Sequence, residues 1–64
     1  MLATIETLIR KFHGRIHEAA GFVIAYFDDP AQTQGCALAI ATQTHREVEW
    51  CGCQLSVLVY GLRG

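Results

Sequence analysis

The residues best suited to hold a metal ion are three cysteines and a histidine between them, Cys36, His45, Cys51 and Cys53. Structural zinc takes four Cys or His ligands, usually with two to four residues between the members of a cysteine pair. Cys51 and Cys53 are separated by a single glycine, and the sequence offers no second matched pair. We therefore interpret the cysteines as small buried apolar residues and predict no cofactor. A small zinc-stabilised protein that uses these four residues is an alternative hypothesis.

The pair Cys51 and Cys53 could also act as a redox dithiol. Thiol–disulfide enzymes favour Cys-x-x-Cys at the N-terminus of a helix, where the backbone lowers the pKa of the thiol. Side chains at positions i and i+2 of an extended strand are badly placed to close a disulfide. The spacing therefore argues against a redox function.

Two histidines, His13 and His17, are four residues apart and would share one face of a helix. Histidines at this spacing can bind a metal, but the metalloprotease pattern places glutamate directly after the first histidine, where this chain has Gly14. We interpret the pair as partly exposed side chains that flank an apolar stripe. A contact through them would be sensitive to pH, since histidine titrates near neutrality.

Three basic residues, Arg10, Lys11 and Arg15, fall within a short segment that ends at His17. On a helix, Arg10 lies on one flank of the apolar stripe while Lys11 and Arg15 lie on the other, so they form no single basic face. The formal net charge of −1 gives no general attraction for nucleic acid. A nucleic-acid-binding regulator that uses the Arg10–His17 segment is the runner-up hypothesis, and a solvated helix rim is the simpler interpretation.

Motifs for catalysis are missing from the sequence. It has no Gly-rich phosphate loop and no nucleophile elbow, and Ser56 is its only serine. The neighbouring carboxylates Asp28 and Asp29 fit an acidic turn, and Glu47 and Glu49 fit the solvent side of a hairpin end. We predict that the protein is not an enzyme.

Composition predicts that part of the surface is covered by another chain. Apolar residues make up 52% of the 64 residues and charged residues 17%, against about 45–50% and about 25% in ordinary globular domains. A chain of this size buries only about 60% of its unfolded surface and needs additional stabilisation. We therefore expect a homo-oligomer.

The compartment is predicted from the cysteines and the apolar stretches. Three cysteines are an odd number, and no leader-like segment opens the chain, which argues against a secreted disulfide framework. The longest uninterrupted apolar stretch, residues 22–27, is far shorter than the roughly 20 residues that span a bilayer. We expect a cytoplasmic protein without a membrane segment.

The clearest periodicity predicts a helix from Leu2 to Ala20, ended by Gly21. Gly14 lies opposite the stripe, where it indicates either a tolerated weakness or close approach by a partner. Apolar residues recur at steps of three and four in this segment: Ile5, Leu8, Ile9, Phe12, Ile16 and Ala19.

Three strands are expected after the helix, and the sequence contains no internal repeat. Residues 22–27 are rich in aromatic and β-branched side chains, residues 36–42 alternate in size, and residues 48–60 form a long apolar stretch interrupted by Gly52. The order Asp29-Pro30-Ala31-Gln32 is also typical of a helix start. An α-β-α-β arrangement with residues 30–44 helical is therefore the alternative.

These elements predict a single small α+β domain over residues 1–64. Its N-terminal amphipathic helix packs on a three-stranded antiparallel meander, which oligomerisation completes. Unbroken alternation makes both faces of these strands apolar: Phe22, Ile24 and Tyr26 lie opposite Val23, Ala25 and Phe27, and Trp50 and Leu58 share a face opposite Leu55 and Val57. One helix covers only one of the two faces. Our leading hypothesis is a non-enzymatic interaction module of the regulator, inhibitor or adaptor type, which binds itself and another macromolecule. Aromatic residues dominate interface energetics, so the expected contacts are Trp50, Tyr60, Tyr26 and Phe27.

Overall fold

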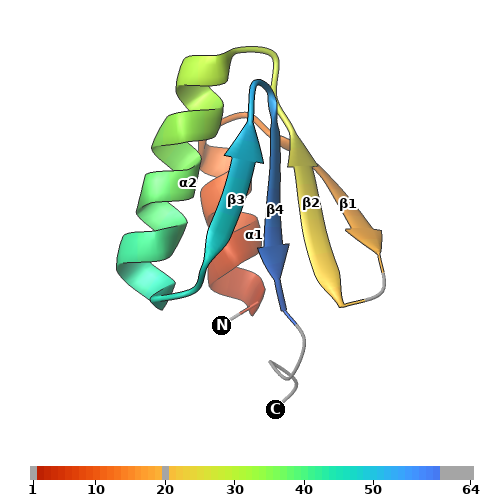
Figure 1. Ribbon diagram of the computed structural model, residues 1–64, viewed down its shortest axis with the longest axis vertical. Helices are drawn as coiled ribbons and strands as arrows, with labels where there is room; N and C mark the ends of the chain where they lie inside the picture. The colour runs from red at the N-terminus through yellow and green to blue at the C-terminus, as the bar shows by residue number, and fades with distance from the viewer. Residues whose placement is uncertain (1, 20, 60–64) are drawn as a thin grey trace.

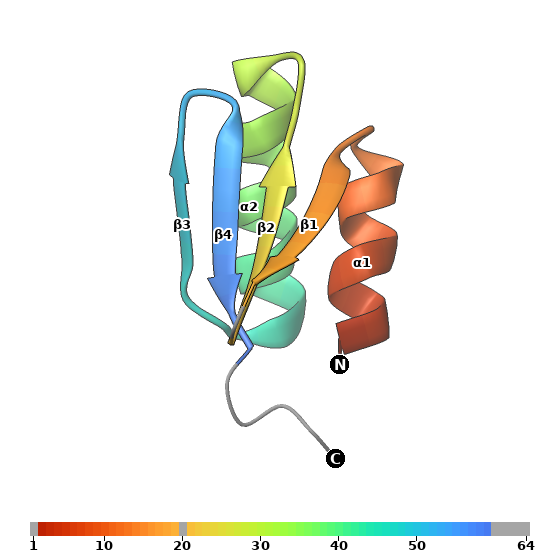
Figure 2. The ribbon, with the colours of Figure 1, turned by 90° about the vertical axis from the view of Figure 1, so that its right-hand side faces the viewer.

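The computed structural model describes residues 2–19 and 21–59 (Figure 1). In these residues the order is α1 (Leu2–Lys11), β1 (Arg15–Ala19), β2 (Phe22–Tyr26), α2 (Pro30–Thr44), β3 (Val48–Cys51) and β4 (Gln54–Leu58). The strands form one antiparallel sheet in the order β1-β2-β4-β3, and both helices lie against the same face of it (Figure 2). The α+β class is confirmed, but the described residues hold two helices and four strands instead of one helix on a three-stranded meander.

Helix α1 ends well before the predicted boundary at Ala20, because His13 adopts the left-handed conformation with φ 67°. The amide of Gly14 donates to the carbonyl of Ile9 at 2.9 Å, and the amide of His13 donates to the carbonyl of Arg10 at 2.9 Å. These two bonds form a Schellman motif, which satisfies carbonyl groups at the end of the helix. The stop signal is therefore His13-Gly14, and the residues after it form β1.

Gly14 is required at this bend by close packing within the chain itself. A Cβ atom at position 14 would lie 2.6 Å from Cε2 of Phe27 and 2.8 Å from Cγ2 of Ile9, closer than real Cβ atoms approach. Ile16, two residues later, still packs against the core, but it does so from β1. The stripe predicted for one long helix is thus shared between a helix and a strand.

Helix α2 occupies residues for which a strand at 36–42 was the first expectation and a helix at 30–44 the alternative. The strand is wrong and the helix is confirmed. Asp29 is the N-cap, and its carboxylate accepts a hydrogen bond of 2.9 Å from the amide of Ala31, while Pro30 opens the first turn. At the other end His45 turns left-handed at φ 57°, and its amide donates to the carbonyl of Ala41.

The buried face of α2 explains why its helical character is hidden in the sequence. Two of its buried residues are threonines, whose hydroxyl groups donate to backbone carbonyls one turn earlier: Thr33 to Asp29, and Thr44 to Ile40 at 2.7 Å. Leu38, by contrast, is 69% exposed. The buried positions follow helical spacing without forming an apolar stripe: Thr33, Cys36, Ala37, Ile40 and Thr44.

A tight hairpin divides the long third strand that was predicted for residues 48–60. Gly52 has φ 59° and begins a two-residue turn, with Cys51 and Gln54 paired across it. Glycine with positive φ at the first turn position is typical of a type II′ hairpin. The turn resets the alternation of side chains, so Trp50 pairs with Leu55 and shares its face, where unbroken alternation would place them on opposite faces.

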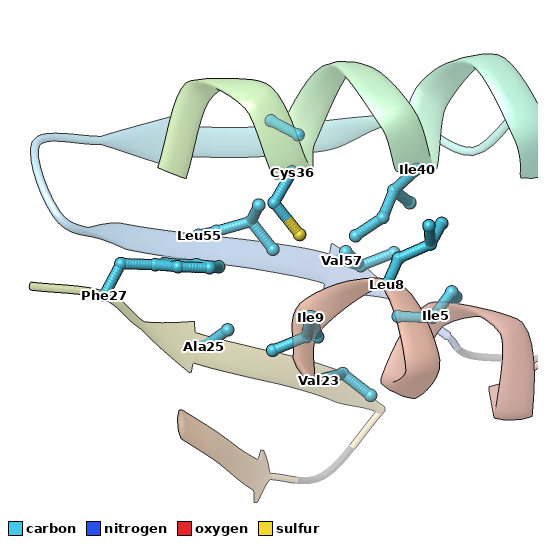
Figure 3. Close-up of a cluster of buried hydrophobic side chains, with 11 residues drawn as sticks. Ile5, Leu8, Ile9, Val23, Ala25, Phe27, Cys36, Ile40, Leu55 and Val57 are labelled. Atoms are coloured by element: carbon cyan, nitrogen blue, oxygen red, sulfur yellow. The ribbon is translucent and has the colours of Figure 1, made fainter. Parts of the chain in front are cut away.

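The core lies between the two helices and the inner face of the sheet (Figure 3). The aromatic ring of Phe12 packs beside Gly35 of α2, where a Cβ atom would lie only 2.9 Å from Cε2 of the ring. This small residue lets the two helices approach. The cluster consists of Ile5, Leu8, Ile9, Val23, Ala25, Phe27, Cys36, Ala37, Ile40, Leu55 and Val57.

The described chain contains one arrangement twice, as α1-β1-β2 and as α2-β3-β4. In each half a histidine with positive φ follows the helix, His13 at 67° and His45 at 57°, and each hairpin turns at a glycine with positive φ, Gly21 at 76° and Gly52 at 59°. Because β2 and β4 are antiparallel neighbours at the centre of the sheet, an approximate two-fold axis perpendicular to the sheet relates the halves. No sequence repeat accompanies this repetition.

Candidate functional site

The face of the sheet that points away from the helices is the most unusual surface of the molecule (Figure 2); we call it the outer face. Alternation along β2 and β4 buries Val23, Ala25, Leu55 and Val57 on the inner face. It leaves three large apolar side chains on the outer face: Phe22 is 43% exposed, Tyr26 37% and Leu58 48%. Ile24 lies among them and is partly buried.

Strand register arranges the outer face in three rows that cross the strands. The apolar row is the pair Phe22 and Leu58 on β2 and β4. The middle row consists of His17, Ile24, Ser56 and Glu49, in the order β1, β2, β4, β3. The polar row, nearest the Gly52 turn, consists in the same order of Arg15, Tyr26, Gln54 and Cys51. Apolar groups therefore occupy the centre and one end of the face.

The two lateral edges of the outer face differ in charge. On β1, the Nη2 atom of Arg15 lies 3.2 Å from Oδ1 of Asp28, in an ion pair whose two side chains are exposed. The ring of His17 packs edge-on against the ring of Tyr26, with centroids 5.3 Å apart and planes at 83°. On the opposite edge, β3 contributes the carboxylate of Glu49. The outer face is thus an apolar centre flanked by basic and imidazole groups on one side and a carboxylate on the other.

The four residues predicted as interface contacts do not form one cluster. Tyr26 lies on the outer face, whereas Phe27 is 3% exposed and packs in the core, so it is no part of the surface. Trp50 is 45% exposed at the margin of the inner face, where it borders a hollow of about 230 Å³ between β3 and α2 that Val48 and Leu38 also line. Tyr60 lies outside the described residues.

Two residues of the outer face, Phe22 and Leu58, were not among the predicted contacts. The alternation in residues 22–27 does place Phe22, Ile24 and Tyr26 on one face, as the structure confirms. Leu58 was assigned to the same side as Trp50, which is wrong because the turn at Gly52 changes the alternation. The turn at Gly52 decides on which side of β4 Leu58 lies, and the long-range pairing of β2 with β4 sets it beside Phe22.

The basic segment predicted as a nucleic-acid contact is divided among three kinds of structure. Arg10 and Lys11 are exposed in the last turn of α1, and His13 lies in the bend after it. Arg15 belongs to β1 and is paired with Asp28. The segment therefore does not present its charges along one helix.

The structure also separates the four residues of the zinc hypothesis. Cys36 is fully buried in the core, and burial raises the pKa of its thiol to about 11. His45 follows the C-terminus of α2, whereas Cys51 and Cys53 lie at the hairpin at the opposite end of the sheet (Figure 1). Within residues 2–19 and 21–59, no group of three or more His, Cys, Asp or Glu side chains is placed to hold a metal ion.

Two further findings concern membrane segments and similarity to known proteins. In the part that the structure describes, neither helix is sufficiently long and apolar to cross a membrane. Comparison with protein-family models, with curated proteins and with solved structures finds no match to this chain. The outer face therefore has to be interpreted from its own chemistry.

Proposed function

We propose that the protein is a non-enzymatic interaction module, of the regulator or adaptor type, that binds another protein chain through the outer face of its sheet. One observation carries this proposal: Phe22 and Leu58 are cross-strand neighbours on β2 and β4 and exposed, and Tyr26 is exposed on the same face beyond Ile24, while both described helices pack on the other face. Contiguous exposed apolar side chains rimmed by polar groups are typical of interaction sites.

The energetics of the outer face favour binding over a purely structural role. Full burial of a Phe or Leu side chain contributes about 1.5–3 kcal/mol. Phe22 and Leu58 are only about half-buried in the isolated chain. Burying the exposed half of each side chain under a partner would therefore contribute roughly 1 kcal/mol more. Aromatic side chains such as Phe22 and Tyr26 lose little conformational entropy on binding and commonly dominate interface energies.

The distribution of polar groups also resembles that of a binding surface. Specific interfaces combine an apolar centre with a polar rim. Here Ile24 lies at the centre, with Arg15 and His17 on the β1 edge and Glu49 on the β3 edge. Such a rim favours partners with complementary charges.

The proposal is tested by photo-crosslinking in cells that naturally produce the chain. One variant carries benzoylphenylalanine at position 24, in the middle of the outer face. The control carries it at position 42, which is exposed on α2. We expect a covalent adduct with a protein chain from position 24 and none from position 42. No adduct from position 24, or equal yields from both positions, would show that the outer face is not a protein-binding site.

A further inference from the structure

We propose that the chain that covers the outer face is a second copy of the protein, stacked face to face about a two-fold axis that runs parallel to the strands between β2 and β4. This inference rests on the proposed function and names its partner. Two aligned sheets that stack in this way lie about 10 Å apart with their strands about 30° from parallel. The evidence is the order of side chains within the three rows of the outer face.

The backbone alone leaves two possible stackings. A two-fold axis in the interface can run parallel to the strands or across them. Because an approximate two-fold axis already exchanges β1 with β3 and β2 with β4, the two stackings present nearly the same backbone surfaces to each other. The side chains must therefore decide between them.

Charge at the edges favours the axis parallel to the strands. That axis brings β1 of one copy over β3 of the other, and His17 and Glu49 belong to the same row. Each His17 then faces Glu49 of the second copy, and the contact occurs twice. An axis across the strands would instead place His17 over His17 and Glu49 over Glu49. Two carboxylates in register oppose association, whereas an imidazole N–H can donate a hydrogen bond to a carboxylate.

Polarity along the strands does not separate the two stackings, so the edge charges carry the choice. When the axis runs parallel to the strands, each row faces the same row of the second copy. Phe22 of each copy then packs on Leu58 of the other. Tyr26 then faces Gln54, whose amide can bond to the phenol. The same axis sets Ile24 over Ser56. The other axis would pair Phe22 with Tyr26 but would set Leu58 over Gln54, so each stacking places one polar side chain against an apolar one.

The size of the face sets the expected affinity. Four strands about 4.8 Å apart and five residues long at about 3.3 Å per residue give a face of roughly 300 Å² in projection. Standard interfaces bury about 800 Å² of accessible surface on each partner. The stacked dimer is therefore smaller than a standard interface, and we expect a weak, reversible association.

Charge-reversal variants measured by sedimentation velocity test this arrangement. The natural chain is followed from about 5 μM to about 1 mM, a range that detects a weak, reversible dimer. The single variant His17→Glu places two carboxylates opposite each other, and Glu49→Lys removes the carboxylate acceptor opposite His17. Each is expected to weaken the dimer roughly tenfold. The double variant His17→Glu with Glu49→Lys restores opposite charges across an axis parallel to the strands. We expect it to regain the affinity of the natural chain.

The control is Arg46→Glu, a charge reversal outside the sheet, which is expected to leave the dimer unchanged. Circular dichroism verifies that every variant is folded. A natural chain that stays monomeric throughout the range would overturn the self-stacking, as would a dimer insensitive to both single variants. A double variant that stays as weak as the singles would show that the axis does not run parallel to the strands. An adduct from position 24 with a different protein would also reject the second copy as partner, while leaving the proposed function intact.

Discussion

The inner and outer faces of the sheet are built by the same strands but have different roles. On β2 and β4 the inner positions are Val23, Ala25, Leu55 and Val57, all buried under the helices. The outer positions include Phe22, Tyr26 and Leu58, which are exposed. Along these two strands the aromatic side chains lie outside, and every inner side chain is aliphatic. This difference indicates that the inner face supports folding while the outer face is available for binding.

The largest expected effect is at the centre of the inner face. Leu55 is fully buried among core residues that include Phe27 and Cys36 (Figure 3). Leu55→Ala removes methyl groups and leaves a cavity, so we expect a loss of about 2–5 kcal/mol in the free energy of unfolding, measured by urea denaturation. Total stabilities of about 5–15 kcal/mol are usual for domains, so this single change removes a large part of the stability.

The matched control for this variant is Leu38→Ala on the exposed surface of α2. It removes the same atoms where no core surrounds them, and we expect a change below about 0.5 kcal/mol. Similar losses for the two leucines would contradict the division between buried and exposed positions.

A smaller effect is expected from adding one methyl group at Gly14. The new Cβ would collide with the ring of Phe27 and with Ile9, and both side chains are held in the core. We expect Gly14→Ala to lower the free energy of unfolding by about 1–3 kcal/mol, through overpacking. The midpoint of thermal unfolding reports the change.

Gly52→Ala provides the comparison for Gly14→Ala. Nothing lies within 4 Å of a Cβ at position 52, but its φ of 59° is left-handed. We expect a cost of about 1 kcal/mol from backbone strain alone. A Phe27→Leu background, which makes room beside position 14, should reduce the cost of Gly14→Ala and leave that of Gly52→Ala unchanged. If the Gly14→Ala cost stays the same in that background, the steric explanation is wrong.

On the outer face a substitution should affect binding more than folding. Phe22→Ser is expected to change the free energy of unfolding by less than about 1 kcal/mol, because the side chain is already half exposed. In the stacked dimer it removes the contact of Phe22 with Leu58 of the second copy, so the dissociation constant should rise by more than tenfold. Sedimentation velocity gives the affinity, and Leu38→Ser is the control for loss of an exposed apolar side chain.

The smallest expected effect is a difference in chemical reactivity between a buried cysteine and an exposed one. Burial raises the pKa of Cys36 to about 11 from 9.0, whereas Cys51 is exposed on the outer face. At pH 8, iodoacetamide should modify Cys51 rapidly and leave Cys36 protected, as peptide mass spectrometry can show. Rapid modification of Cys36 under native conditions would contradict its burial.

The same pKa shift sets the direction of a pH effect on stability. Because the folded state binds the thiol proton of Cys36 more tightly than the unfolded state, the contribution is fully present below pH 9 and is lost as the pH rises from 9 toward about 11. Cys36→Ala should show a shallower loss of stability over this range than the natural chain. Equal slopes would show that Cys36 does not contribute to the alkaline loss.

Several parts of the fold could be predicted from the sequence because local chemistry determines them. The aromatic and β-branched residues 22–27 predicted β2 and the correct facing of Phe22, Ile24 and Tyr26. The order Asp29-Pro30 marked the start of α2, where the structure shows the cap. The apolar positions of α1 likewise predicted its buried side. In each case a few neighbouring residues carry the signal.

Other parts could not be predicted because tertiary contacts decide them. Ile16 satisfies helical spacing and strand alternation equally well, so only the Schellman motif at His13 and Gly14 separates α1 from β1. The buried face of α2 contains Thr33 and Thr44, whose hydroxyl groups need local carbonyl partners that the sequence does not reveal. The outer face as a site depends on Leu58 lying beside Phe22, and this pairing joins residues far apart in the chain.

The two like halves of the chain have a consequence for the symmetry of the proposed assembly. The internal axis is perpendicular to the sheet, and the dimer axis would lie in the interface parallel to the strands, so together they generate a third axis. Two chains would then arrange four helix-hairpin units with approximate D2 symmetry, the point group that usually requires a tetramer. Only the dimer axis would be exact, since the contrast between His17 on β1 and Glu49 on β3 breaks the other two.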